Sequence, residues 1–443
     1  MNQRAKYVNG RRRQTVENDI IKGGLSFPLL LITVTLILIG VIMVFSSTYV
    51  STVLSGHEGY RNAVQHTIVA IVCILFICIA NKYINYRWLR NKKIVLTAVV
   101  CTALMLLLVF LFPARNNAHR WIEIGSLTFQ PSEIAKFVAI IYMSWYASKN
   151  KNWHSNLKTW IFYFSTSIAF AVLIVAEPNL STALICILAP ALIMAFVSGL
   201  HLGWAIVGGT AAVIFGVCMV LFTNWREGRL QAWLDPWIDP QESSYQIVQS
   251  LYALGNGGLF GVGLGNSKQK ISYLPMKDTD YIFAIIAEEF GFIGAVLVIL
   301  LYAAFVFFAI KVALNAPDAF GCYLATGITV IVALQAIINI SVVTNLIPST
   351  GVTLPFISRG TSSLLCFSFG VTLLLNISRY SRRKKATTAE VDANNVNRFS
   401  EDLHSEKEKS MDILPKRHNT LKRNRRNERK RSDRSKSHIR VLK

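Results

Sequence analysis

Asp280 is the acidic residue whose position most favours chemistry. It follows Thr279 and directly precedes an apolar run that opens with Tyr281-Ile282-Phe283. A carboxylate at the edge of a membrane span is costly to keep there without a function. An aspartate at this place is also a common helix N-cap, but a cap does not explain Glu288 and Glu289, which follow two turns later and need a polar cavity or basic partners. The pattern favours Asp280 as a base that takes a proton from a reacting hydroxyl.

A second ionisable pair stands in Gln130-Pro131-Ser132-Glu133-Ile134-Ala135-Lys136. Glu133 and Lys136 are three residues apart, so they share a helix face and can neutralise each other. They open an apolar run, where such a pair usually faces the interior of a helix bundle. Arg120 and Trp121 lie just upstream, and ordinary anchoring at a membrane interface explains both of them. Both residues also remain candidates for contact with a substrate.

The turn Ala176-Glu177-Pro178-Asn179-Leu180 joins two apolar runs. Proline and asparagine suit a turn that breaks a helix. Glu177 is less expected, because a turn does not need a carboxylate at membrane depth. Structural capping and the wall of a polar cavity are both open for it.

A long polar interval, 224–281, separates two apolar runs. Asp235 and Asp239 each precede a proline, which predicts successive turns with the aspartate oxygens capping backbone amides. The stretch 244–254 has helical spacing, with Tyr245, Val248, Leu251 and Tyr252 on one apolar face, and so predicts a helix lying in the membrane interface.

Glycines fill 255–265 and are followed by Lys268 and Lys270. A nucleotide-binding loop is excluded because no strand–turn–helix unit surrounds them and no Gly-Lys-Ser/Thr ending is present. The glycines and both lysines remain candidates for close approach to a lipid-linked pyrophosphate. Further on, 348–363 is rich in proline, glycine and hydroxyls and carries Ser358 and Arg359. Membranes tolerate such a broken helix only where backbone is buried in protein or lines a cavity.

The elements that position these residues are membrane helices. The chain has 443 residues, of which 53% are hydrophobic, and its apolar runs approach the 20 or so residues that cross a bilayer. The runs are continuous, which excludes a β-barrel, and no internal repeat supports an inverted-repeat transporter. The sequence predicts an all-α membrane protein of about ten spans. These lie near 25–47, 62–81, 94–112, 134–148, 160–176, 182–200, 203–223, 282–310, 322–346 and 352–377.

Basic residues set the predicted orientation. They gather in 1–24, in the second–third and fourth–fifth connections, and at the start of the tail 381–443. With an even number of spans these segments share one side, which the positive-inside rule makes cytoplasmic, so both termini are cytoplasmic and 224–281 is extracellular. The net charge of +22 owes much to the tail. We expect a disordered tail that is attracted to anionic lipids, and no nucleic-acid binding.

The ordered motifs over about residues 25–380 resemble the SEDS (shape, elongation, division and sporulation) family, which comprises FtsW, RodA and SpoVE. The resemblance rests on His-Arg-Trp-Ile at 119–122, Gln-Pro-Ser-Glu-Ile-Ala-Lys at 130–136, the Asp-Pro turns, Gly-Asn-Ser-Lys-Gln-Lys at 265–270, Thr-Asp-Tyr-Ile-Phe at 279–283 and Thr-Gly-Val-Thr-Leu-Pro-Phe-Ile-Ser at 350–358. The stretch 265–270 is more similar to the FtsW and SpoVE branch than to RodA.

The resemblance implies a peptidoglycan glycosyltransferase that polymerises lipid II at the outer face of the bacterial cytoplasmic membrane during cell division. It implies Asp280 as the essential aspartate, Glu133 and Lys136 in the same cavity, and a class B penicillin-binding protein and other divisome proteins as partners at the septum. Three departures stand out: Asn179 where the family usually has aspartate, Arg359 where it usually has tyrosine, and Met276-Lys277-Asp278 after Pro275, where a glutamate commonly follows the proline.

Two other functions share the expected fold and lipid substrate: a lipid II flippase or transporter, and a non-catalytic scaffold that activates a penicillin-binding protein. Asn179 and Arg359 keep the scaffold open. No cofactor is firmly predicted, and a divalent cation, Mg²⁺ or Mn²⁺, is an open alternative.

Overall fold

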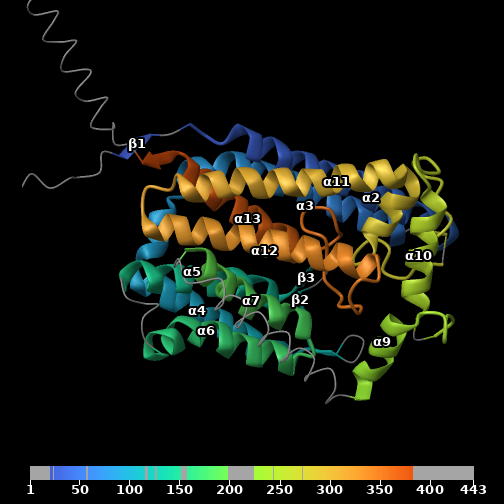
Figure 1. The fold of residues 1–443 in the computed structure, drawn as a ribbon, viewed down its shortest axis with the longest axis horizontal. Coiled ribbons are helices and arrows are strands. Elements are labelled where there is room, and N and C mark those ends of the chain that lie inside the picture. The colour runs from blue at the N-terminus through green and yellow to red at the C-terminus, as the bar shows by residue number, and fades with distance from the viewer. Residues whose placement is uncertain are drawn as a thin grey trace, which may run out of the picture. The chain divides into compact units, whose positions relative to one another are not determined.

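The computed structural model describes residues 20–22, 24–55, 58–114, 118–124, 127–150, 157–197, 224–242, 244–271 and 273–382. Nine long helices form the bundle within these residues (Figure 1): α2 (Phe27–Ser55), α3 (Glu58–Tyr83), α4 (Lys92–Leu108), α5 (Pro131–Lys149), α6 (Leu157–Ala176), α7 (Leu180–Val197), α11 (Ile282–Leu314), α12 (Ala319–Val343) and α13 (Thr361–Ser378). Of the helices in the described part, seven are long and apolar enough to cross a membrane; α5 and α7 fall outside that set.

The predicted spans match these helices at nine of their ten places, and the remaining one, 203–223, lies outside the described residues. The predicted start of the last span at 352 is wrong, because α13 begins at Thr361. The preceding segment is irregular, and Gly351 and Phe356 both have positive φ, of 69° and 68°. Pro131 opens α5 in its first turn, where a missing amide donor is harmless.

Short strands join distant parts of the chain. β1 (Ile20–Lys22) pairs antiparallel with β4 (Tyr380–Arg382), so the start of α2 and the end of α13 lie at one end of the bundle. The connection from α3 to α4, which contains η2 (Tyr86–Arg90), lies there too: the Tyr86 amide donates to Asn376 of α13 at 3.0 Å. The described parts of these basic segments therefore share one end, as the charge pattern predicts; residues 1–19, 151–156 and 383–443 lie outside the described residues.

The opposite end carries the long polar interval (Figure 1), which includes α9 (Asn224–Leu234) and α10 (Tyr245–Gly257). The helix predicted from 244–254 is α10, but its buried side chains include Ile247, Val248 and Ala253, whereas Tyr252 is exposed. The predicted apolar face is thus partly wrong. The predicted Asp-Pro turn is confirmed at Asp235, whose carboxylate accepts the Trp237 amide at 3.0 Å.

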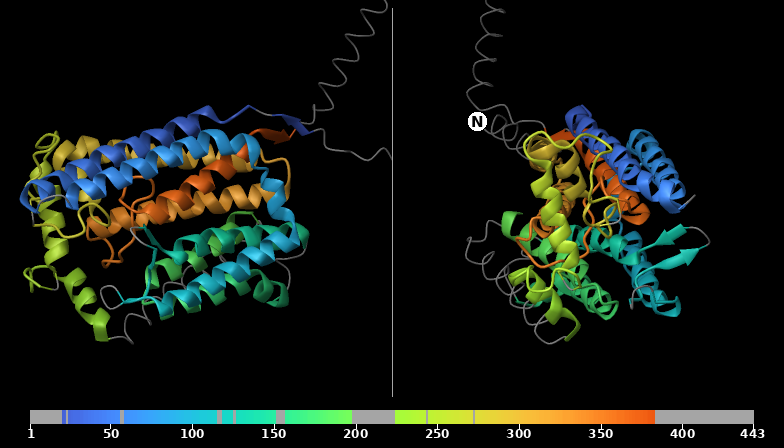
Figure 2. Two further views of the ribbon diagram at one scale, coloured as in Figure 1. Left: turned by 180° about the vertical axis from the view of Figure 1, so that it is seen from behind. Right: turned by 90° about the vertical axis from the view of Figure 1, so that its right-hand side faces the viewer.

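The core lies around α12, which packs against α11 and α13 and also against α5 and α7. Figure 2 shows α2 and α3 side by side, with α11, α12 and α13 beside them and α4 to α7 beyond. Gly327 permits close contact on the α5 and α7 side, because a Cβ there would lie 2.4 Å from Ile140 and 2.8 Å from Ile193. A hairpin of β2 (Ile122–Ile124) and β3 (Leu127–Phe129) precedes α5 and contacts the first turn of α13, where the Thr361 hydroxyl donates to the Thr128 carbonyl at 3.0 Å.

Candidate active site

Asp280 lies two residues before α11, and α12 holds its backbone. The Asn339 side chain donates to the Asp280 carbonyl and to the Val352 carbonyl, at 2.7 Å each. The Asp280 side chain itself is only half-buried and lies close to Gly351: a Cβ on that glycine would be 3.6 Å from the Asp280 carboxylate. The carboxylate is therefore carried on a backbone whose carbonyl is bonded to α12, which helps to place a base that must meet its proton at hydrogen-bond distance.

The charges around Asp280 set its proton affinity. Burial and, to a smaller extent, the Asp278 carboxylate raise the pKa of Asp280 to about 6, against the opposing effect of Arg120 and Arg229. Loss of solvent disfavours the charged form of an acid, and a neighbouring positive charge favours it. A pKa near 6 leaves Asp280 mostly ionised at neutral pH and still basic enough to accept a proton.

Glu133 and Lys136 form the predicted neutralising pair on α5. The Lys136 ammonium lies 2.8 Å from the Glu133 carboxylate, and both side chains are buried in the bundle. Lys136 also donates to Gln335 of α12 at 2.6 Å, and the Gln335 amide donates to the Thr353 carbonyl at 3.2 Å. The segment 350–354 is thus the meeting point of this pair and of the Asp280 backbone.

Gln335 and Asn339 were not identified from the sequence. They stand one helical turn apart on α12, so they share a face, and both are buried. A signal was available, because polar side chains inside a predicted span usually face the bundle interior and mark functional sites. Their amides carry no charge, so the pattern of ionisable residues in the sequence does not mark them.

Glu177 is fully buried in the turn between α6 and α7, and its carboxylate accepts no hydrogen bond from the described residues. The capping role that the sequence left open is therefore wrong. Burial raises the pKa of Glu177 to about 8, and Arg120 opposes the rise. Arg120 donates to the backbone carbonyls of Glu177, at 3.2 Å, and Pro178, so it fixes this turn as well as facing Asp280. Asn179 donates to Ser132 at 3.4 Å, beside the start of α5.

Ser358 and Trp121 are both predicted to contact the substrate, and they lie in separate parts of the structure. The Ser358 hydroxyl donates to the Thr279 carbonyl at 2.5 Å and accepts the Leu354 amide at 2.8 Å. It therefore joins the turn before Asp280 to the segment before α13, which gives it a structural function; its contact with substrate stays a prediction. Trp121 is half-buried directly before β2.

The glycine-rich segment packs against a break in α11. Gly291 has φ 69°, which interrupts the helix, and the amides of the next two residues donate to the carbonyls of Gly258 and Leu259. Gly261 lies against the same break: a Cβ there would be 2.2 Å from the Glu289 carbonyl. Glycine is thus required here for close backbone packing. This position does not support the predicted approach of the glycines to a pyrophosphate.

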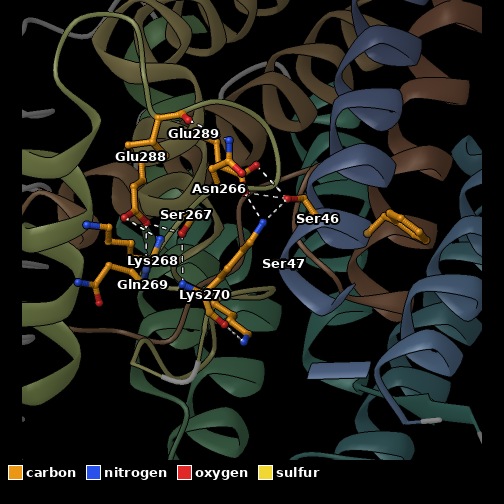
Figure 3. Close-up of polar contacts among 12 residues, drawn as sticks. Ser46, Ser47, Asn266, Ser267, Lys268, Gln269, Lys270, Glu288 and Glu289 are labelled. Atoms are coloured by element: carbon orange, nitrogen blue, oxygen red, sulfur yellow. Dashed lines mark hydrogen bonds and ion pairs between the residues drawn. The ribbon is translucent and has the colours of Figure 1, made fainter. Parts of the chain in front are cut away.

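Two buried acids of α11 bind the residues that follow the glycine-rich segment (Figure 3). Glu288 accepts the Ser267 hydroxyl and the amides of Lys268, at 3.1 Å, and Gln269, at 3.3 Å. Glu289 pairs with the Lys270 ammonium at 2.7 Å. The expectation that these two glutamates need polar or basic partners is confirmed.

Lys270 is buried in that pair and also donates to Ser46 of α2 at 3.0 Å. Its place does not support the predicted contact with a lipid pyrophosphate. Lys268 uses its backbone amide in the cluster and has an exposed side chain, so it remains open to an anionic ligand.

The described residues contain no group of three or more His, Cys, Asp or Glu side chains that could hold a metal ion. The donors present around Asp280 therefore do not fit a divalent-cation site made of protein ligands alone.

A family model described as "Cell cycle protein", covering FtsW, RodA and SpoVE, matches residues 27–383. The chain belongs to the FtsW/RodA/SpoVE family. Stage V sporulation protein E of Bacillus subtilis (strain 168) is 38% identical over 359 residues, which cover 80% of this chain and 97% of that protein. The probable peptidoglycan glycosyltransferase FtsW of Geobacter sp. (strain M18) is 35% identical over an alignment that covers 81% of this chain and 98% of that protein.

Two solved structures share the fold of this chain. One is a chain from a peptidoglycan synthase complex that coordinates polymerization and crosslinking, with a TM-score of 0.66 and 24% identity over 80% of this chain and 98% of that one. The crystal structure of the Rod shape determining protein RodA of Thermus thermophilus has a TM-score of 0.56 and 22% identity, and covers 82% of this chain and 99% of that one. The predicted class, an all-helical membrane protein, is confirmed.

Proposed function

We propose that this chain is a peptidoglycan glycosyltransferase that polymerises lipid II, with Asp280 as the general base. The observation that supports this most is the combination at Asp280: a half-buried carboxylate with a pKa near 6, on backbone fixed by Asn339, with Arg120 and Arg229 in electrostatic reach. Relatives that the chain matches over most of both lengths carry the name probable peptidoglycan glycosyltransferase FtsW.

In the proposed reaction, Asp280 removes the proton from the 4-hydroxyl of the acceptor N-acetylglucosamine. That oxygen attacks the anomeric carbon of the donor N-acetylmuramic acid, the bond from this carbon to the pyrophosphate oxygen breaks, and undecaprenyl pyrophosphate leaves with the electron pair. Arg120 and Arg229 are the cations best placed to stabilise the charge on the leaving group, because both already act on Asp280. The ammonium of Lys136 is shared with Glu133 and Gln335, so it is a less available cation.

The cellular setting is also a proposal. The 224–281 interval would face outward, both termini would be cytoplasmic, and the protein would act at the division septum with a class B penicillin-binding protein and other divisome proteins. The solved neighbour from a peptidoglycan synthase complex supports such a partner by analogy of fold alone. The similarity to a sporulation protein makes sporulation the alternative setting, and imaging of a fluorescent fusion during division and sporulation separates the two.

The test is polymerisation of labelled lipid II by the purified chain with its penicillin-binding protein, with glycan products resolved by length. Asp280→Asn should lower the rate by at least about 100-fold, the usual effect of losing a general base. Asp235→Asn is the matched control: this aspartate is exposed, it caps a turn through an oxygen that asparagine retains, and its loss of charge should leave polymerisation intact.

Each alternative gives a different result. Polymer that forms equally with Asp280→Asn refutes the proposal. No polymer from the native chain, with transfer of labelled lipid II across vesicle membranes, would assign a flippase. Activation of the partner by both the native chain and Asp280→Asn would assign a scaffold. Parallel reactions with chelator, Mg²⁺ or Mn²⁺ decide whether a divalent cation is required.

A further inference from the structure

Two segments from distant parts of the sequence meet directly before Asp280. One is the turn at 275–281 and the other is the segment at 351–360 that leads into α13. The Arg359 amide donates to the Asp278 carbonyl at 2.8 Å, and the Ser358 hydroxyl donates to the Thr279 carbonyl at 2.5 Å. The two residues before Asp280 are thus both bonded through their carbonyls to the same short segment.

The side chains add an ion pair at this junction. The Arg359 guanidinium lies 2.5 Å from the Asp278 carboxylate, with 32% and 13% of the two side chains exposed. A charge-assisted contact of this length between partly buried groups is stronger than a surface pair. The neighbouring charged or titratable side chains are Lys277, which acts on Asp278, and His66 of α3, which faces Arg359.

Both partners stand in motifs where this chain departs from its family. Arg359 replaces the usual tyrosine, and Asp278 lies in the altered run 276–278 that follows Pro275. Arg359 carries a positive charge and Asp278 a negative one, and both lie near the proposed base. The structure shows that these two opposite charges face each other.

The pairing matters because Asp278 is the charged group that opposes ionisation of Asp280. Among the described residues, four titratable groups act on or respond to Asp280: Asp278 on its own turn, Tyr281 directly before α11, Arg120 before β2 and Arg229 on α9. Burial also raises the pKa of the Tyr281 phenol, which therefore stays uncharged. Asp278 is thus the one negative neighbour among these four, and a cation bound to it weakens its field at Asp280.

We propose that Arg359 is a positioning residue for the reaction: by binding Asp278 it both fixes the turn that carries Asp280 and keeps Asp280 ionised at neutral pH. This inference rests on the proposed function of Asp280 as the base.

The test is the pH dependence of lipid II polymerisation by the full-length chain with its partner, for the native protein, Arg359→Gln, Asp278→Asn and the double variant. The native rate should fall as the pH drops through about 6, where Asp280 takes up its proton. Arg359→Gln leaves Asp278 unpaired and should move this acidic limb up by about one pH unit; Asp278→Asn should move it down by a similar amount. In the double variant the limb should return to the native position.

Arg359→Lys keeps the positive charge and should keep the native limb, which makes it the control for loss of packing. Opposite shifts distinguish the proposal from a purely structural function, which would lower the rate at every pH without moving the limb. Coincident limbs for Arg359→Gln, Asp278→Asn and the native chain would overturn the inference, provided that Asp280→Asn is inactive in the same assay. An active Asp280→Asn would instead refute the proposed function itself, so the two failures are distinguishable.

Discussion

The buried ion pair between Lys270 and Glu289 allows a sharp test of whether the lysine supports the fold or the substrate. Lys270→Met removes an ammonium that lies 2.7 Å from Glu289 and 3.0 Å from Ser46, in a place where both charged side chains are no more than 1% exposed. The Glu289 carboxylate would then keep only the Ser46 hydroxyl as a side-chain donor among the described contacts.

The expected loss of stability follows from that geometry. Removing one partner of a buried ion pair typically destabilises a protein by about 3–5 kcal/mol, because an unpaired charge is left without solvent. Ser46→Ala removes a hydrogen bond to the same carboxylate but leaves the pair, and should cost about 1.5–3 kcal/mol. Replacing both charged residues, in Lys270→Met with Glu289→Met, removes the unpaired charge and should recover most of the loss.

Thermal unfolding of the detergent-solubilised protein, followed by tryptophan fluorescence, measures these differences. Lys268→Met is the matched control, since its ammonium lies on an exposed side chain of the same segment and should leave the melting temperature unchanged. The reasoning is refuted if Lys270→Met melts together with Lys268→Met. If the double Met variant is stable but cannot polymerise lipid II, Lys270 contacts the substrate after all, and the original sequence prediction was right.

Three further predictions follow from single positions. Glu177→Gln should raise the melting temperature at pH 8 and flatten its pH dependence. The folded-state pKa of Glu177 is raised from 4.5 to about 8, so the stability that this group contributes is fully present below pH 4.5 and is lost as the pH rises through 8. Equal pH slopes for variant and native chain would contradict this. Gly261→Ala should destabilise by at least about 2 kcal/mol, from positive φ and contact with backbone, whereas Gly255→Ala, in open space on α10, should be neutral or slightly stabilising; similar melting temperatures would show that the segment does not need its glycines. Asn339→Leu should reduce polymerisation by about 10- to 100-fold while the chain still folds, because the Asp280 carbonyl loses its donor; an unchanged rate in the lipid II assay would remove Asn339 from the site.

The helices were largely predictable because a run of about 20 apolar residues by itself indicates a membrane-spanning helix. The Glu133–Lys136 pair was also predictable from local sequence, because three-residue spacing on a helix determines which side chains meet. Residues 351–360 were harder, because apolar composition continues through an irregular segment. Hydropathy does not register the positive φ of Gly351 and Phe356, and so it placed the start of α13 too early.

Contacts between distant segments could not be predicted from one sequence. A run of glycines with nearby lysines is compatible with a bound phosphate and equally with packing against a broken helix. The break that distinguishes the two is at Gly291, some thirty residues further on. Lys270 was assigned to substrate because its partner Glu289 belongs to the following helix and Ser46 to the first one. The pairing of Asp278 with Arg359 is likewise a product of the fold.

A base that stands in a turn must be positioned by something more rigid than the turn, and α12 meets that need. Gln335 and Asn339 project from one face of this helix: the first binds Lys136 and Thr353, and the second binds the backbone of Asp280 and Val352. A shift of α12 would therefore move the base and the Glu133–Lys136 pair together. Substitutions at either amide should accordingly impair catalysis more than they impair folding, which is the reverse of the pattern expected at Lys270.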